Sequence, residues 1–244
     1  MLQILNLMQA FIDDRFEINY VPVVDPQIKQ VSAYEIAVEL TYEDKVYYED
    51  DFMPILRREG MNSYYDGYIF TKVCELIKTR NRKNPDDYIK VIFALSSETL
   101  YNPIKIYDIV MEAKDDIDSG LIMFKLPVDI NYLEDRNIRK VISFLNSEGF
   151  SYMIEYRGSD NDINVIENEM FRDDFNDSKL KLVEVNQIDS KQMKILNDAL
   201  STIGIKMVYT GVDSEKALKN ARRDGADLVK GSFYKALKSI DELN

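Results

Sequence analysis

Apolar residues follow two alternating spacings along the chain, and this alternation predicts a repeated order of helix, glycine and strand. Between residues 190 and 203 the apolar positions recur every three or four residues, and this helical stretch ends at Gly204 before the short apolar run IKMVY. The same order recurs at Gly149, which precedes FSYMIEY, and at Gly225, which precedes ADLVKG. Glycine after a helix favours the left-handed turn that ends it, because glycine has no Cβ to clash. Strands that alternate with helices are typical of a mainly parallel sheet with helical crossovers.

Eight short apolar runs are predicted to be strands, and they cover residues 16–25, 29–40, 88–95, 120–128, 150–156, 179–185, 205–209 and 226–231. Amphipathic stretches predict helices, the first over residues 4–12 and others that begin near Asp51, Met61, Lys105 and Asn131. The segment YEDKVYYEDD is interpreted as a small excursion or a hairpin. No linker rich in Gly, Ser or Pro divides the sequence, so residues 1–244 are interpreted as one domain. Eight strands with intervening helices fit a closed α/β barrel, and periodicity alone leaves an open doubly wound sheet as the alternative.

The amino-acid composition excludes several kinds of catalytic and metal-binding site. The 244 residues include no His and one Cys, and 43 Asp and Glu against 31 Lys and Arg give a formal net charge of -12. Without His there is no His general base or His metal ligand, and Cys74 alone cannot form an intramolecular disulfide or a Cys-cluster zinc site. The acidic balance argues against binding of a nucleic-acid polymer or an anionic membrane surface. No apolar run approaches the roughly 20 residues that span a bilayer, and the start lacks the basic region of a signal peptide. The sequence therefore predicts a cytoplasmic protein.

Functional side chains are expected at the carboxyl ends of the strands, where barrels and doubly wound sheets both gather them. The predicted strand ends supply a set of charged and polar candidates at Glu35, Glu39, residues 94–97, Lys125, Glu155, Tyr156, residues 181–184, residues 209–213 and Lys230.

A set of segments follows in a fixed order along the chain, among them FEINYVPVVD, AYEIAVEL and DGADLVKGSFY. These segments resemble those of the EAL domain, the family of bacterial cyclic di-GMP phosphodiesterases. FEINYVPVVD resembles the opening strand of that family, AYEIAVEL the segment with the Glu-Ala-Leu signature, and IKVIFALSSETLYNP the strand and turn that normally contain Asn-Leu-Ser. EDDFMPILRREGMNSYYDGYIFTKVCELI resembles the helices that follow the signature, and TGVDSEKAL and DGADLVKGSFY resemble the segments near the end. The resemblance implies a single TIM-like (β/α) barrel over residues 1–244.

In this family, carboxylates and an Asn at the strand ends hold divalent metal ions that activate water for attack on a phosphodiester, assisted by a lysine. The resemblance matches Glu35 to the signature glutamate and Glu155 to one of two adjacent aspartates. It places Ala94 at the metal-binding Asn, Lys125 at a metal-binding Glu and Tyr156 at the second aspartate. Mg²⁺ needs several oxygen ligands, so these losses imply a vestigial site without a metal or other cofactor.

Three further positions depart from the family pattern in their charge. Glu39 aligns with an arginine that contacts substrate, so a carboxylate that repels phosphate replaces a cation that attracts it. Lys230 aligns with a glutamine, and Asp213 keeps only the last carboxylate of a Glu-Gly-Val-Glu motif.

The Lys-Ile-Asp motif of the family can be aligned in two registers. In one register Lys181 is its lysine and Val183 stands at its aspartate. In the other, Leu182 and Glu184 occupy the two positions. Neither register keeps both groups.

These replacements predict a charge cluster of Glu35, Lys125 and Glu155 in place of the metal site. A buried lysine is less costly when it is paired with carboxylates than when it is alone. Lys125 and Lys230 also allow an alternative, in which two cations bind nucleotide phosphates without metal.

Three functional hypotheses follow from the resemblance. The first is a catalytically inactive EAL-like domain that acts as a regulator or adaptor by binding a protein partner, whose identity no residue indicates. The second is a metal-independent cyclic di-GMP receptor without hydrolysis. The third is a weak or repurposed metal-dependent phosphodiesterase. The resemblance also allows a dimer.

Overall fold

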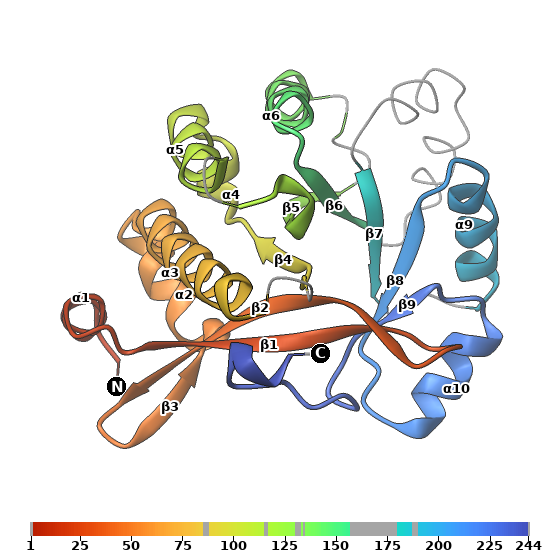
Figure 1. Cartoon of the computed structure of the whole chain (residues 1–244), viewed down its shortest axis with the longest axis horizontal. Helices are drawn as coiled ribbons and strands as arrows, with labels where there is room; N and C mark the ends of the chain where they lie inside the picture. The colour runs from red at the N-terminus through yellow and green to blue at the C-terminus, as the bar shows by residue number, and fades with distance from the viewer. Residues whose placement is uncertain are drawn as a thin grey trace.

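Eight strands close into a ring, which the computed structural model of the chain shows together with the helices around it (Figure 1). The structure describes residues 2–84, 88–114, 117–129, 133, 135–156, 180–186 and 190–243. The strands of the ring are β1 (Phe16–Asp25), β2 (Gln30–Tyr42), β4 (Val91–Ala94), β5 (Ile122–Asp129), β6 (Ser151–Tyr156), β7 (Leu180–Asn186), β8 (Lys206–Thr210) and β9 (Leu228–Val229). The predicted closed barrel is therefore confirmed, and the open doubly wound sheet is wrong.

The ring closes through β1, which is antiparallel to both of its neighbours, β2 and β9. The other neighbouring pairs around the ring, from β2 through β4 to β9, are parallel. A short turn joins β1 to β2, and such a connection permits only an antiparallel pair. Outside the ring, β3 (Lys45–Tyr48) forms the predicted hairpin with β2.

Helices lie outside the ring in the predicted alternation with the strands (Figure 1). They are α1 (Ile4–Ile12), α2 (Glu49–Arg58), α3 (Asn62–Lys83), α4 (Ser97–Leu100), α5 (Pro103–Lys114), α6 (Arg136–Ser147), α9 (Ser190–Thr202) and α10 (Glu215–Arg223), with short 3₁₀ turns at η1 (Ser119–Leu121) and η3 (Ile240–Glu242). The helix predicted to start near Asn131 begins at Arg136, because the Asp135 carboxylate accepts hydrogen bonds from the first free backbone N–H groups.

Two apolar cores result from the alternation of side chains along the strands. The outer core lies between the strands and the helices and contains the aromatic cluster of Phe70, Phe93 and Phe124. The inner core fills the barrel and consists of Val23, Ala33, Ile92, Met153, Leu182, Val208 and Leu228, with Met123 packed against them. We call this inner core the apolar plug.

The C-terminal segment is attached to the outside of the barrel below β1 and β2 (Figure 1). Tyr20 and Leu237 exchange two backbone hydrogen bonds of 2.8 and 2.9 Å. From α3, the buried Arg80 donates from Nη2 to the carbonyl oxygen of Leu243 at 2.9 Å. These contacts fix the chain that follows β9.

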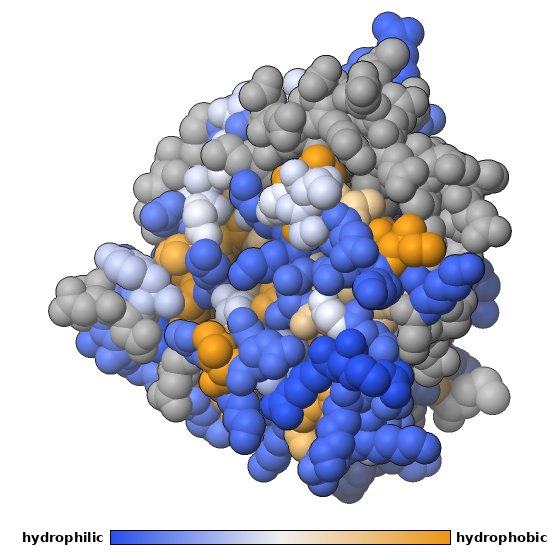
Figure 2. All heavy atoms as spheres, turned by 90° about the vertical axis from the view of Figure 1, so that its right-hand side faces the viewer, coloured by the Kyte–Doolittle hydropathy of each residue, from blue (hydrophilic) through white to orange (hydrophobic). Residues whose placement is uncertain are grey.

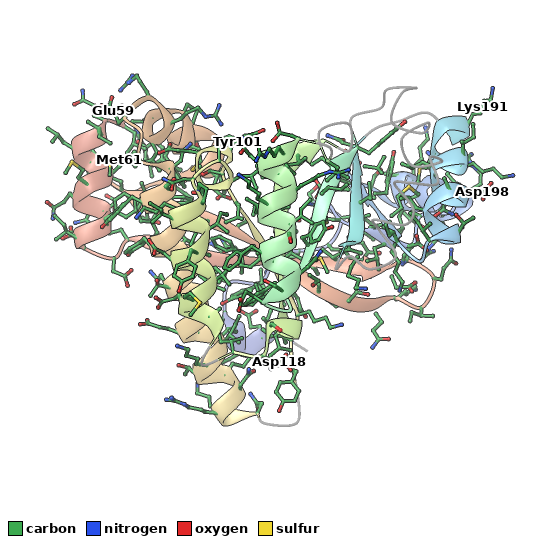
Figure 3. The ribbon with its side chains drawn as sticks, turned by 90° about the horizontal axis from the view of Figure 1, so that it is seen from above. Glu59, Met61, Tyr101, Asp118, Lys191 and Asp198 are labelled. Atoms are coloured by element: carbon green, nitrogen blue, oxygen red, sulfur yellow. The ribbon has the colours of Figure 1, made fainter. Side chains whose placement is uncertain are left out.

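The outer surface is mostly polar where α9 and α10 lie. Figure 2 shows this side as a largely hydrophilic face with a few separate hydrophobic residues. Lys191 and Asp198 project outward from α9 (Figure 3). Within the described ranges, no helix is both long and apolar enough to cross a membrane.

Candidate functional site

The candidate site occupies the interior of the barrel next to the apolar plug, toward the carboxyl ends of the parallel strands. Side chains alternate along a strand, so the residue two positions beyond each plug residue faces the same interior. This counting places Glu35 after Ala33, and Lys230 after Leu228. The full set reached in this way from the parallel strands is Glu35, Ala94, Lys125, Glu155, Glu184, Thr210 and Lys230.

Four of these side chains form a closed set of ion pairs, which we call the ion quartet. It consists of Glu35, Lys125, Glu184 and Lys230. Lys125 Nζ lies 2.8 Å from both carboxylate oxygens of Glu184 and 3.3 Å from Glu35 Oε1. Lys230 Nζ lies 2.9 Å from Glu184 Oε2 and also donates to Glu35 Oε2. Each lysine therefore bridges both glutamates.

The ion quartet is largely shielded from solvent and keeps its charges. The four side chains are between 13% and 14% exposed. Burial alone would lower the pKa of Lys125, but the carboxylates of Glu35 and Glu184, with a contribution from Glu155, hold that pKa above its ordinary value. Burial would likewise raise the pKa of Glu184, but Lys230 and Lys125 hold it below its ordinary value. Two positive and two negative charges thus compensate one another inside the barrel.

Lys230 is positioned by a close approach of two backbone segments. Its backbone N–H donates to the carbonyl oxygen of Tyr209 at 2.9 Å, and its own carbonyl oxygen accepts from Val212 at 3.2 Å. The next residue, Gly231, has φ 158°, and a Cβ there would lie 2.3 Å from the carbonyl oxygen of Val212. Only glycine fits at this position, and the chain can therefore direct Lys230 into the ion quartet.

The predicted pairing of Glu35 with Lys125 is confirmed, and the structure adds Glu184 and Lys230 to it. Glu155 acts on Lys125 through its charge. Sequence reasoning left Glu184 in one of two alternative registers. The alternation of β7 from the plug residue Leu182 is the signal that selects the second register.

Four other predicted site residues lie away from the ion quartet. Glu39 is 16% exposed and forms an ion pair with Lys238 at 3.0 Å. Tyr156 is buried in the outer core, and Asp213 is exposed beyond the end of β8. Lys181 lines a cavity at the amino-terminal ends of the strands, so it lies at the opposite mouth of the barrel from the ion quartet. The loop RGSD at residues 157–160 is outside the described residues.

The residues present at the site do not fit a divalent cation. Each carboxylate of the ion quartet already has two ammonium groups bound to it, and Ala94 carries no ligand atom. An Mg²⁺ ion would need several of these oxygens free. Within the described part of the chain, no three His, Cys, Asp or Glu residues are grouped so that they could hold a metal ion.

A further carboxylate, Glu49, is enclosed at the start of α2. Its Oε1 accepts a hydrogen bond from the Tyr65 hydroxyl at 3.0 Å, and its Oε2 accepts one from the backbone N–H of Val38 at 3.3 Å. Burial raises the pKa of Glu49 to about 7, and the negative charges of Glu35 and Asp66 act in the same direction.

We expect Glu49→Gln to stabilise the protein at alkaline pH and to leave its stability nearly unchanged in mild acid. The folded-state pKa of Glu49 lies above the unfolded value, so the folded chain binds the extra proton and loses stability as pH rises between the two values. Gln keeps an acceptor for the backbone N–H of Val38 and offers its amide N–H to the Tyr65 hydroxyl oxygen. It removes this loss, which is about 3 kcal/mol above pH 7. Urea unfolding at about pH 5 and about pH 8 measures the difference. The exposed Glu215→Gln is the control, and an equal effect of Glu49→Gln at both pH values would contradict the prediction.

An eight-stranded α/β barrel with charged side chains gathered inside it places the chain among the TIM-barrel proteins. The family model described as EAL domain matches residues 5–236, and the chain belongs to this family. No curated protein matches the chain.

Solved structures of EAL proteins share the fold at low sequence identity. The chain is similar to the "PaMucR Phosphodiesterase, c-di-GMP complex", with 13% identity, a TM-score of 0.79 and coverage of 98% of this chain and 99% of that chain. It is similar to the FimX EAL domain of Xanthomonas citri in complex with c-di-GMP, with 13% identity and a TM-score of 0.78. That match covers 99% of this chain and 95% of that chain. It is also similar to the FimX EAL domain of Pseudomonas aeruginosa bound to c-di-GMP. The identity is 15%, the TM-score is 0.75, and the match covers 97% of this chain and 96% of that chain.

Proposed function

We propose that this chain is a catalytically inactive EAL domain that acts in cyclic di-GMP signalling as a regulator or adaptor. The observation that carries the proposal is the ion quartet. Lys125 and Lys230 hold their ammonium groups against Glu35 and Glu184, in the place where the family resemblance expects a metal ion. Among the described residues, the position at which the family resemblance expects a metal to activate water is therefore filled by ammonium groups.

An exposed apolar surface supports the part of the proposal that concerns a protein partner. Tyr101, Ile104 and Tyr107 are between 52% and 72% exposed near the start of α5, where Figure 3 labels Tyr101. Tyrosine and large apolar side chains gathered on a surface are typical of protein interfaces.

A second candidate function is binding of cyclic di-GMP without hydrolysis. It is favoured by structural neighbours that are described as complexes with c-di-GMP, among them the three named above. Against it, both lysines of the site are already paired with carboxylates, and Glu39 adds a further negative charge on β2. A phosphate would have to displace these ion pairs.

The test is calorimetry and turnover with the full chain. We expect no heat of binding with Mn²⁺ and no hydrolysis of cyclic di-GMP in the presence of Mg²⁺ or Mn²⁺. Hydrolysis that disappears in Glu35→Gln would overturn the proposal of inactivity. Submicromolar binding of cyclic di-GMP without turnover would select the receptor function over the adaptor function.

A further inference from the structure

The opposite mouth of the barrel contains a second cavity, which is separate from the ion quartet. This cavity has a volume of about 690 Å³ and is lined by the first residues of the parallel strands and by the turn between β1 and β2. Its inner wall includes the plug residues Ile92, Leu182 and Leu228. The apolar plug therefore separates the cavity from Glu35 and Lys230.

Three lysines line this cavity, and the strand geometry explains why they meet. Lys90 precedes the plug residue Ile92 by two positions, and Lys206 precedes Val208 by two, so strand alternation directs both toward the interior. Lys181 reaches the same cavity at an irregularity of β7, where the pairing with β6 steps from Leu180 directly to Leu182. A bulge of this kind changes the direction of a side chain.

These lysines differ from those of the ion quartet because they form no ion pair with any described residue. Within the described ranges, no carboxylate lies within ion-pair distance of Lys90, Lys181 or Lys206, and all three are exposed. Asp25 is the one acidic residue among the described residues that line the cavity. Its Oδ1 is already used, because it accepts from the backbone N–H groups of Gln27 at 2.8 Å and of residue 28 at 3.3 Å.

The concentration of positive charge is unusual for this chain. The formal net charge is -12, and yet the described lining of this cavity includes three lysines and one acidic residue. Placing like charges together without compensation costs free energy, and an anionic ligand would recover that free energy.

The remaining residues that line the cavity indicate which class of anion it would bind. The hydroxyl-bearing residues Ser32 and Ser151 add groups that donate hydrogen bonds, and Met123 and Leu121 add apolar surface. A volume of about 690 Å³ is that of a site for a small organic molecule. Several lysines together with hydroxyl donors favour phosphate groups, and apolar walls favour an organic portion attached to them.

We propose that the amino-terminal mouth of the barrel is a binding site for a small organic polyphosphate, of the nucleoside triphosphate class. Lys90, Lys181 and Lys206 bind the phosphates, and the apolar walls contact the rest of the ligand. The site is distinct from the ion quartet and does not depend on the function proposed for it.

The test is isothermal calorimetry of the full chain with ATP, and separately with pyrophosphate, in the presence of a chelator. We expect binding of ATP, and a loss of affinity of at least about tenfold in Lys181→Met/Lys206→Met, since two of three phosphate contacts are removed. The matched control is Lys216→Met/Lys219→Met, which removes two positive charges from α10 and is expected to change the affinity less than about twofold.

All four lysines are exposed, so we expect both double variants to fold. Thermal unfolding of the two variants checks this. Equal loss of affinity in the two double variants would overturn the proposal, since it would show that ATP is held by non-specific electrostatic attraction and not by this cavity. Absence of ATP binding by the natural chain would overturn it as well. Binding of pyrophosphate as tight as that of ATP would contradict the role given to the apolar walls.

Discussion

Lys125→Met is expected to lower the free energy of unfolding by about 3 kcal/mol at neutral pH. In the natural chain Lys125 Nζ binds Glu35 and Glu184 together, at 3.3 and 2.8 Å. Without it, two largely buried carboxylates share the single ammonium group of Lys230, and one negative charge is left without compensation. Urea unfolding of the two proteins measures the loss.

A second variant separates the loss of pairing from the loss of a side chain. Lys125→Met/Glu184→Met removes one charge of each sign and leaves the Glu35–Lys230 pair, so its cost should be about 1 kcal/mol or less. Lys219→Met is the surface control, because its ion pair with Glu215 is about 70% exposed and solvent screens it, so its loss should change the free energy of unfolding very little. If Lys125→Met costs no more than Lys219→Met, the ion quartet contributes nothing to stability.

The pH dependence of the free energy of unfolding gives an independent measure of how much the ion quartet stabilises the protein. The pKa of Glu184 is lowered in the folded chain, so its stabilisation is present above the unfolded pKa and is lost as pH falls through the folded value. The pKa of Lys125 is raised, so its stabilisation is present below the unfolded pKa and is lost only as pH rises through the folded value. In the variant, burial raises the pKa of the carboxylate that is left without compensation. The difference between Lys125→Met and the natural chain should therefore be largest from about pH 7 to about pH 10 and shrink in acid. A difference that grows below about pH 4 would contradict this account.

Local patterns in the sequence account well for the elements and less well for their arrangement. The predicted strand at residues 16–25 is β1 without change, and Gly149, Gly204 and Gly225 have positive φ after α6, α9 and α10 as expected. Each of these features depends on neighbouring residues only. The antiparallel direction of β1 depends on how the ring closes, although the short turn before Gln30 already required it.

The site shows the same division between local and long-range information. Glu35 and Lys230 are separated by 195 positions, so their ion pair exists only because β1 closes the ring between β2 and β9. Lys181 and Glu184 could not be placed from spacing alone, since the irregular pairing of β7 moves Lys181 to the other mouth of the barrel. A bulge has no strong sequence signal, and it shifts the alternation on which such predictions depend.

The second large effect is a gain of metal binding in a triple variant. Ala94→Asn/Lys125→Glu/Lys230→Gln removes both ammonium groups from the ion quartet and adds oxygen ligands. Glu35 and Glu184 are then free to bind a cation beside the new side chains. We expect the affinity for Mn²⁺ to rise at least about tenfold over the natural chain, as measured by calorimetry and by an increase in the melting temperature with Mn²⁺.

The control for this gain is Ala94→Asn alone, which adds a ligand but keeps both lysines against Glu35 and Glu184. It should not bind Mn²⁺ more tightly, because the ammonium groups still occupy the carboxylate oxygens. If Ala94→Asn alone gains affinity, the lysines do not block the site, and the physical basis of the proposed inactivity is wrong. If the triple variant gains affinity but does not hydrolyse cyclic di-GMP, the loss of activity extends beyond the metal ligands. Glu39 is then the next position to change, because its carboxylate lies on β2 where the family resemblance expects an arginine that contacts substrate. Glu39→Arg added to the triple variant would test whether that reversal of charge is what excludes the phosphodiester.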